Sequence, residues 1–147
     1  MCLKKVLLSS MLLMLVLSVS AQSSLRRQGD AMQLVVDGQP MVILGGELSN
    51  SAATCVADID SVMPRMAQLG LNTVLVPAQW DLTEPVEGQF DFTLIDRTIQ
   101  RARENNLKVV FLWFGAWKNS MSCYAPLWFK RDTKRFPRAM TRAGKPL

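Results

Sequence analysis

The chain has 147 residues and a net charge of +5, and 49% of its residues are hydrophobic, 20% charged and 7% aromatic. This composition excludes a disordered, collagen-like or low-complexity protein, and the length allows one domain or part of one. Because the chain has three cysteines and no histidine, a Cys/His zinc cage, a Ser-His-Asp triad and a Cys-His pair are also excluded.

The first 21 residues have the features of a secretory signal peptide. Lys4 and Lys5 precede an apolar run over residues 6–17, and small residues precede the bond between Ala21 and Gln22. About twelve apolar residues are too few for a membrane span, which needs roughly 20. We therefore expect cleavage after Ala21, a secreted or periplasmic mature protein and no stable membrane span in it. An uncleaved N-terminal anchor is the alternative.

The mature chain is expected to begin with a short linker over residues 22–31, followed by a β-hairpin. Apolar runs flank Asp37-Gly38, and Asp-Gly between such runs predicts a hairpin turn. The second run, residues 41–44, continues into Gly45-Gly46-Glu47 and is interpreted as the first strand of a parallel sheet.

A helix is expected next. Apolar residues recur at helical spacing from Ile59 to Leu69, and Gly70 is placed to end the helix. Pro64 is expected in the first turn or at a kink.

Two later runs, residues 73–76 and 109–114, are apolar throughout, as is typical of strands buried on both faces. Between them we expect a loop and then a helix that begins with a capping box at Thr93 and Asp96 and ends at Asn105-Asn106. A further loop leads to a helix start at Pro126.

Strands and helices therefore alternate, which predicts a parallel α/β fold, either a barrel or a doubly wound sheet. No glycine-rich nucleotide-binding motif is present, and no cofactor is expected. Three βα units take about 95 residues, whereas an eight-unit barrel takes about 250. The predicted fold is the N-terminal portion of a TIM (β/α)8 barrel, preceded by the hairpin and truncated after the third βα unit, over residues 32–147.

The charge is uneven along the chain. Residues 130–147 hold seven Lys and Arg side chains against the single carboxylate of Asp132. Basic tails can bind nucleic acid or anionic membranes, but no nucleic-acid motif and no aromatic interleaving accompanies this one. We expect a solvated helix face and no nucleic-acid partner.

In a (β/α) barrel the chemistry lies at the C-terminal ends of the strands. Tryptophan together with amides and carboxylates is the set that a sugar site needs, because a pyranose face stacks on indole and its hydroxyls need donors and acceptors. The candidate substrate-binding residues in the three loops are Glu47, Asn50, Gln79, Trp80, Trp117, Lys118 and Asn119.

Some of these residues have structural alternatives. Trp80 and Trp117 either stack on a sugar or cover the barrel mouth, whereas Glu84 and Glu87 are expected to support a turn. No metal site is expected.

Two cysteines remain in the mature chain. Cys55 follows the first strand and Cys123 follows the third, in a compartment where a disulfide can form. They form one only if their Cα atoms lie within about 7 Å.

Several motifs resemble glycoside hydrolases. Residues 80–92 (WDLTEPVEGQFDF) resemble the segment after the second strand of clan A glycoside hydrolases, especially the β-galactosidase families. Residues 34–47 (LVVDGQPMVILGGE) look like the hairpin and first barrel strand of glycoside hydrolase family 35. Residues 112–124 (LWFGAWKNSMSCY) and 135–138 (RFPR) resemble a bacterial branch of that family.

This resemblance implies a retaining β-galactosidase-like enzyme that cleaves terminal β-galactosyl residues from oligosaccharides or polysaccharides. Retaining enzymes use two carboxylates about 5 Å apart. The resemblance places them after the fourth and seventh strands, so we expect no catalytic residue in this chain and no activity from it alone. The alternative is a non-catalytic carbohydrate-binding or interaction fragment.

Overall fold

The computed structural model of the protein describes residues 23–118 and 123–146. The chain divides into two compact units, residues 1–42 and 43–147. The expected signal peptide lies outside the described residues. Within the described residues, no helix has the length and apolar character needed to cross a membrane.

The first unit contains a three-stranded antiparallel sheet. Strand β1 (Ser23–Gln28) pairs with β2 (Ala31–Val36), and β2 pairs with β3 (Gln39–Pro40). The hairpin predicted around Asp37-Gly38 is confirmed. Both turn residues have positive φ angles, 51° for Asp37 and 76° for Gly38, as a two-residue turn that matches the strand twist requires.

Two parts of this unit differ from the sequence-based expectation. Residues 22–31 were expected to form a linker, but Gly29 adopts a φ of 59° and turns the chain so that β1 pairs with β2. The second arm of the hairpin is also shorter than expected. Strand β3 ends at Pro40. One further main-chain hydrogen bond joins the Met41 N–H to the Leu34 carbonyl at 2.8 Å, but residues 41–44 form no strand.

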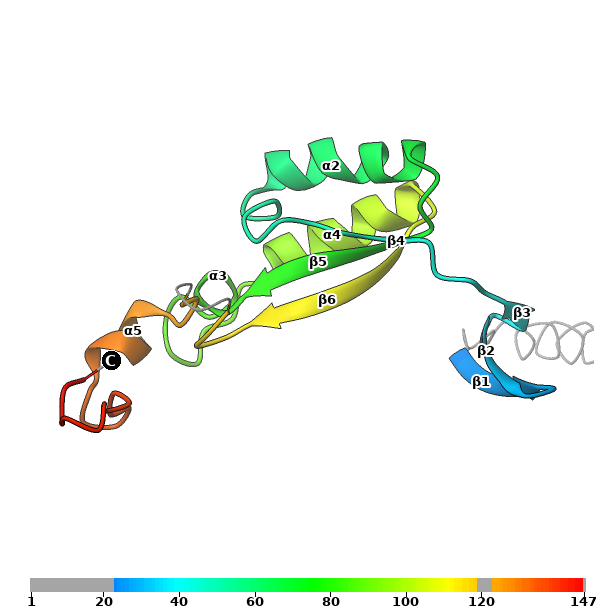
Figure 1. The fold of residues 1–147 in the computed structure, drawn as a ribbon. Coiled ribbons are helices and arrows are strands. Elements are labelled where there is room, and N and C mark those ends of the chain that lie inside the picture. The colour runs from blue at the N-terminus through cyan, green and yellow to red at the C-terminus, as the bar shows by residue number, and fades with distance from the viewer. Residues whose placement is uncertain (1–22, 119–122, 147) are drawn as a thin grey trace, which may run out of the picture. The chain divides into compact units, whose positions relative to one another are not determined.

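The second unit is a parallel α/β arrangement. Strands β4 (Gly45–Glu47), β5 (Thr73–Gln79) and β6 (Lys108–Phe114) lie side by side in chain order. Helices α2 (Val56–Gln68) and α4 (Thr93–Glu104) connect them and cover the same face of the sheet (Figure 1). A doubly wound sheet reverses its strand order and has helices on both faces. The predicted portion of a (β/α)8 barrel is therefore confirmed.

One core joins the helices to the sheet. Ile59 and Met63 of α2 are fully buried and belong to the same cluster as Val74 and Val76 of β5 and Ala102 of α4. The two valines are two positions apart and so point to the same face of the strand. The helical spacing that predicted α2 therefore identified the residues that hold it on the sheet.

Strand β6 is less buried than the sequence predicts. Val110, Phe111 and Trp113 are 44%, 36% and 56% exposed. β6 is one of the two edge strands of the described parallel sheet. An apolar strand is buried on both faces only where neighbouring elements cover it. The expectation that residues 109–114 are buried on both faces is therefore wrong for Trp113, which lies in this run.

The two connecting helices end in the same way. Gly70 after α2 has a φ of 78° and Asn106 after α4 has a φ of 54°. The next residue in each case, Leu71 or Leu107, donates its N–H to the carbonyl five residues earlier, at 3.3 and 2.9 Å. This is the Schellman pattern, and both leucines then pack on the core. The helix ends predicted at Gly70 and Asn105-Asn106 are confirmed.

The start of α4 differs from the predicted capping box. The helix begins at Thr93 itself, and the carboxylate of Asp91 accepts the Thr93 N–H at 2.8 Å. Hydrogen bonds from the side chain and then the main chain of Thr93 lower the pKa of the Asp91 carboxyl. Asp91 therefore supplies the side-chain acceptor that the sequence predicts for Thr93, because the helix starts one residue earlier than a Thr93 cap requires.

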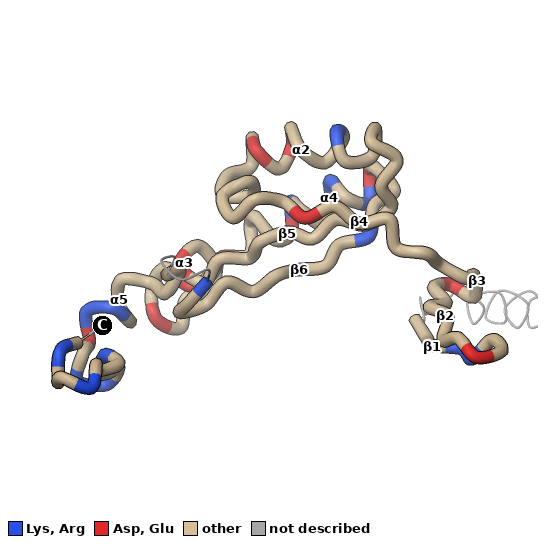
Figure 2. The backbone as a smooth tube through the Cα atoms, in the orientation of Figure 1, with Lys and Arg blue, Asp and Glu red and all other residues tan. Residues whose placement is uncertain are grey.

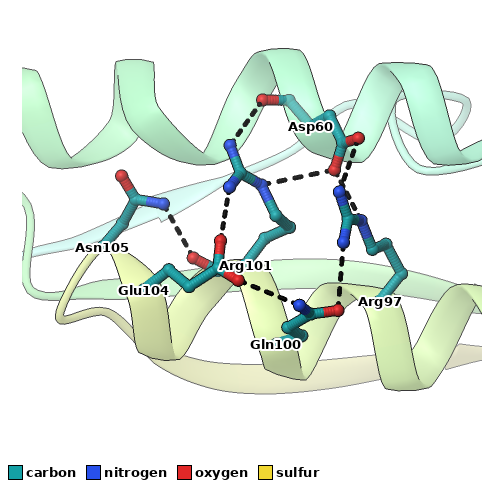
Figure 3. Close-up of polar contacts among 6 residues, drawn as sticks. All are labelled: Asp60, Arg97, Gln100, Arg101, Glu104 and Asn105. Carbon is teal, nitrogen blue, oxygen red and sulfur yellow. Dashed lines mark hydrogen bonds and ion pairs between the residues drawn. The ribbon is translucent and has the colours of Figure 1, made fainter.

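Pro64 lies inside α2 and not in its first turn. Proline has no N–H, so the carbonyl of Asp60 loses its helical partner. Arg101 of α4 donates to that carbonyl through Nη2 at 3.3 Å, and Arg97 donates to the Asp60 carboxylate at 2.7 and 2.8 Å (Figure 3). Asp60 thus links the two covering helices through its main chain and its side chain.

Candidate active site

The carboxyl ends of the three parallel strands lie at one edge of the sheet. The segments that follow them are the first loop (residues 48–55), the second segment (80–92) and the third loop, of which residues 115–118 and 123–126 are described. The second segment begins with the short helix α3 (Trp80–Thr83), and the third loop leads to α5 (Leu127–Arg131). Figure 1 shows β5 and β6 pointing toward α3 and α5. In a barrel, this edge carries the chemistry.

Two predicted site residues share the sheet face that the helices leave open. The register pairs Glu47 with Leu75, and Leu75 lies an even number of positions from Gln79. These three side chains therefore point away from the face that carries Val74 and Val76. The open face of the sheet is the interior face of a barrel. Glu47 is exposed there and Gln79 is half-buried.

Gln79 joins the first loop to the second segment. Its Nε2 donates to the main-chain oxygen of Asn50 at 2.8 Å, and its own main-chain oxygen accepts from Thr83 Oγ1 at 2.8 Å. The bond to Asn50 uses the main chain, so it fixes the loop and not the Asn50 amide. Gln79 therefore positions the loop that carries another candidate.

Trp80 lies in α3 and belongs to an aromatic cluster. The centroid of its ring is 5.7 Å from that of Trp128, nearly perpendicular to it, and 5.0 Å from that of Phe129. Its Nε1 donates to Glu84 Oε2 at 2.7 Å. With its ring packed and its N–H paired, Trp80 is better suited to covering the barrel mouth than to stacking on a sugar.

Glu84 organises the turn after α3. Its two carboxylate oxygens accept the Nε1–H of Trp80 and, at 2.8 Å, the N–H of Gly88. Those two hydrogen bonds, that of Trp80 above all, lower the pKa of the Glu84 carboxyl. The main-chain oxygen of Glu84 accepts from Trp128 Nε1 at 3.0 Å. Glu84 thus has the structural role that its sequence context predicts.

The third loop presents Trp117 and Lys118. The Trp117 side chain is exposed, whereas the Lys118 Nζ lies 4.5 Å over the ring of Phe114, the last residue of β6. The ring quadrupole attracts the ammonium group, so Lys118 is held at the strand end. Asn119, the remaining candidate of this loop, lies outside the described residues.

Among the described residues, both cysteines are free and exposed thiols. Cys55 is the N-cap residue of α2, and Cys123 lies in the third loop. The structure gives the proposed disulfide no support. Within residues 23–118 and 123–146, no three His, Cys, Asp or Glu side chains come together as a metal site.

The sequence did not reveal the partners that α5 and the following residues supply. Phe129 stacks on Phe136 at 4.3 Å, and Arg135 forms a two-point ion pair with Glu87 at 3.1 and 2.8 Å. The available signal was the placing of Trp128-Phe129 and Phe136 at the two ends of a charged run over residues 130–135. The charge pattern alone predicts a solvated helix face there.

The family follows from comparison with known proteins. Residues 48–137, more than half of the chain, match glycoside hydrolase family 42, the β-galactosidase family. The chain belongs to this family. The clan A membership expected from the motifs is confirmed, whereas the assignment to family 35 is not supported by the match. The span matched to this β-galactosidase family includes all three segments that follow the strands, and it begins one residue after Glu47, the last residue of β4.

Solved glycoside hydrolases share the fold. An exo-β-1,4-mannosidase from Opitutaceae bacterium strain TAV5 is 24% identical with a TM-score of 0.50, over 60% of this chain and 17% of that one. An endo-1,4-β-mannanase from Rhizomucor miehei is 19% identical with a TM-score of 0.51, over 77% of this chain and 34% of that one. The chain therefore spans a minor part of either enzyme. Among curated proteins, none matches the chain.

Proposed function

We propose that the chain forms the N-terminal part of the catalytic barrel of a retaining β-galactosidase that removes terminal β-galactosyl residues from oligosaccharides or polysaccharides. The observation that carries this proposal is the family match over residues 48–137. The geometry supports it, since Glu47, Gln79 and Trp117 bring a carboxylate, an amide and an exposed indole to the carboxyl edge. A sugar ring needs these three kinds of group.

In this proposal the described residues bind and orient the sugar. Trp117 offers a stacking face to a ring of the saccharide, and Glu47 accepts hydrogen bonds from its hydroxyls. Gln79 and Glu84 hold the surrounding segments in place, which matters because misplaced contacts cost rate steeply. The two carboxylates of a retaining mechanism would follow the fourth and seventh strands of the complete barrel, as the resemblance implies.

The test uses the complete protein encoded by the gene that contains this chain, with chromogenic β-galactoside and β-mannoside substrates. The mannoside is chosen as the comparison substrate because two solved structures with a similar fold are a mannosidase and a mannanase. We expect kcat/KM to be at least about tenfold higher for the galactoside, and β-galactose to be the first product seen by NMR.

Three other outcomes count against parts of the proposal. Preference for the mannoside contradicts the galactosyl specificity, and α-galactose as the first product contradicts retention. Galactoside binding without turnover of either substrate supports the alternative, a non-catalytic carbohydrate-binding protein.

Export is part of the same proposal. The cationic start, the short apolar run and the small residues before Gln22 favour a cleaved signal peptide. N-terminal sequencing of the protein from the periplasm or the medium is expected to begin at Gln22. An intact Met1 terminus in the membrane fraction contradicts export by cleavage.

A further inference from the structure

A groove of about 530 Å³ lies between the third loop and the residues that follow α5. Its volume is in the range of small-ligand sites. We call it the tail groove. Its aromatic lining residues are Trp117, Phe129 and Phe136, and its basic lining residues are Lys130, Arg135 and Arg138.

The tail groove carries positive charge that no described carboxylate balances. Arg135 lies 2.8 Å from both Glu87 and Asp132 and is neutralised by them. Lys130 and Arg138 form no ion pair with any residue in the described ranges. They contact main-chain oxygens at 3.5 and 3.3 Å, which bear no net charge. Figure 2 shows the basic residues gathered in α5 and the segment after it.

The tail groove also offers an aromatic surface. The Trp117 side chain is 70% exposed. Phe136 is fixed in place by its stacking on Phe129 at 4.3 Å and by the Arg135 guanidinium, 4.8 Å over its ring. An exposed indole binds the apolar face of a pyranose. An indole beside two unpaired cations therefore matches a ligand that is both a sugar and an anion.

We propose that the tail groove binds a uronic acid residue, with its carboxylate between Lys130 and Arg138 and its ring stacked on Trp117. Arg138 donates to the main-chain oxygen of Lys130, so the two cations belong to one local site. A guanidinium presents parallel N–H groups that match a planar carboxylate. This inference rests on the proposed function, because it names an acidic sugar in the oligosaccharide whose galactosyl end enters the barrel.

The test measures the binding of three trisaccharides to the complete protein by calorimetry at low salt. The probes share a β-1,4-linked backbone and differ only at C6: cellotriose, the corresponding triglucuronate and 6-O-sulfated cellotriose. We expect the triglucuronate to bind at least about tenfold more tightly than cellotriose, because a charge-assisted pair replaces a hydroxyl contact. Equal binding of these two overturns the proposal. Tighter binding of the sulfated probe overturns the choice of a carboxylate.

Two double variants separate a site from general electrostatic attraction. Lys130→Gln with Arg138→Gln removes two charges from the tail groove, and Lys134→Gln with Arg142→Gln removes two from the same segment outside its lining. We expect only the first pair to lose the preference for triglucuronate, with circular dichroism unchanged in both. Equal loss in the two pairs overturns the proposal.

The variant Trp117→Ala is an independent test of the proposal, because it removes the indole on which the sugar stacks and leaves both charges in place. We expect it to weaken the binding of triglucuronate severalfold, and unchanged binding overturns the placement of the ring. Hydrolysis of a neutral β-galactoside by the unmodified protein tests the proposed function separately. Turnover without the acidic preference overturns only the tail-groove proposal, and the preference without turnover overturns only the hydrolase.

Discussion

The guanidinium of Arg101 donates a hydrogen bond to the main-chain oxygen of Asp60 at 3.3 Å. That oxygen has no helical partner because the residue four positions later is Pro64. The contact therefore gives a hydrogen-bond donor to the Asp60 carbonyl, which Pro64 leaves without one inside α2. It also joins α2 to α4. These are the two helices that cover the sheet behind the candidate site.

Arg101→Met keeps the apolar stem of the side chain and removes the donor. We expect the variant to unfold a few degrees lower, because a half-buried carbonyl loses its hydrogen bond. Pro64→Ala restores the helical N–H, so Arg101→Met is expected to cost less in that background. Thermal unfolding of the two single variants and the double variant measures the coupling. An equal cost in both backgrounds contradicts it.

The Glu84 carboxylate makes the turn after α3 sensitive to acid. The hydrogen bond from Trp80, and then that from Gly88, hold the pKa of Glu84 below its ordinary value of 4.5. A carboxyl with a lowered folded-state pKa stabilises the protein above its unfolded pKa, and this contribution is lost as the pH falls through the folded value.

The corresponding variant is Glu84→Gln. We expect it to have a lower Tm than the unmodified protein at neutral pH. The difference is expected to shrink as the pH falls from 4.5 through the lower pKa of the folded carboxyl, below which the native side chain is also neutral. Thermal unfolding at a series of pH values measures this. A Tm difference that is the same at neutral and acid pH contradicts a stabilising role of the charged form.

Gly46 and its neighbour Gly45 give a matched pair of substitutions in β4. A Cβ on Gly46 would lie 2.6 Å from Leu71 Cδ1, whereas a Cβ on Gly45 would meet nothing closer than 3.4 Å. Leu71 packs against the core, so a shift of its side chain disturbs that packing. We expect Gly46→Ala to lower the free energy of unfolding by about 1–3 kcal/mol, and Gly45→Ala to cost less. Denaturant unfolding measures both, and the reverse order contradicts the packing argument.

Much of the second unit could be predicted from local signals. Gly70 and Asn106 mark the helix ends because few residues adopt a positive φ, and uninterrupted apolar runs mark the strands. The exposure of Trp113 could not be predicted in the same way. Whether an apolar strand residue is buried depends on what lies beside the strand, and that information is not contained in the run itself.

The position of the candidate site could be predicted from the sequence, but the contacts of its residues could not. The rule that barrel chemistry lies at the strand ends located Glu47 and Gln79. The pairing of Arg135 with Glu87 joins residues 48 positions apart, so no local pattern contains it. The packing of Trp80 depends likewise on Trp128, which reaches it only once α5 has folded back over the second segment.

Gln79 holds the first loop against the second segment through the 2.8 Å bond from its Nε2 to the Asn50 carbonyl. Gln79→Glu has the same size and loses the donor. In the complete protein, we expect it to lower kcat/KM on a β-galactoside about tenfold or more, since displacing a positioned binding loop by about 1 Å costs up to about 100-fold in rate. Gln89→Glu makes the same charge change at an exposed residue of the second segment and is expected to be near wild type. Steady-state kinetics of both variants measure this difference. Wild-type activity in Gln79→Glu contradicts the positioning role of Gln79. Equal losses of kcat/KM in both variants assign the effect to the added charge alone.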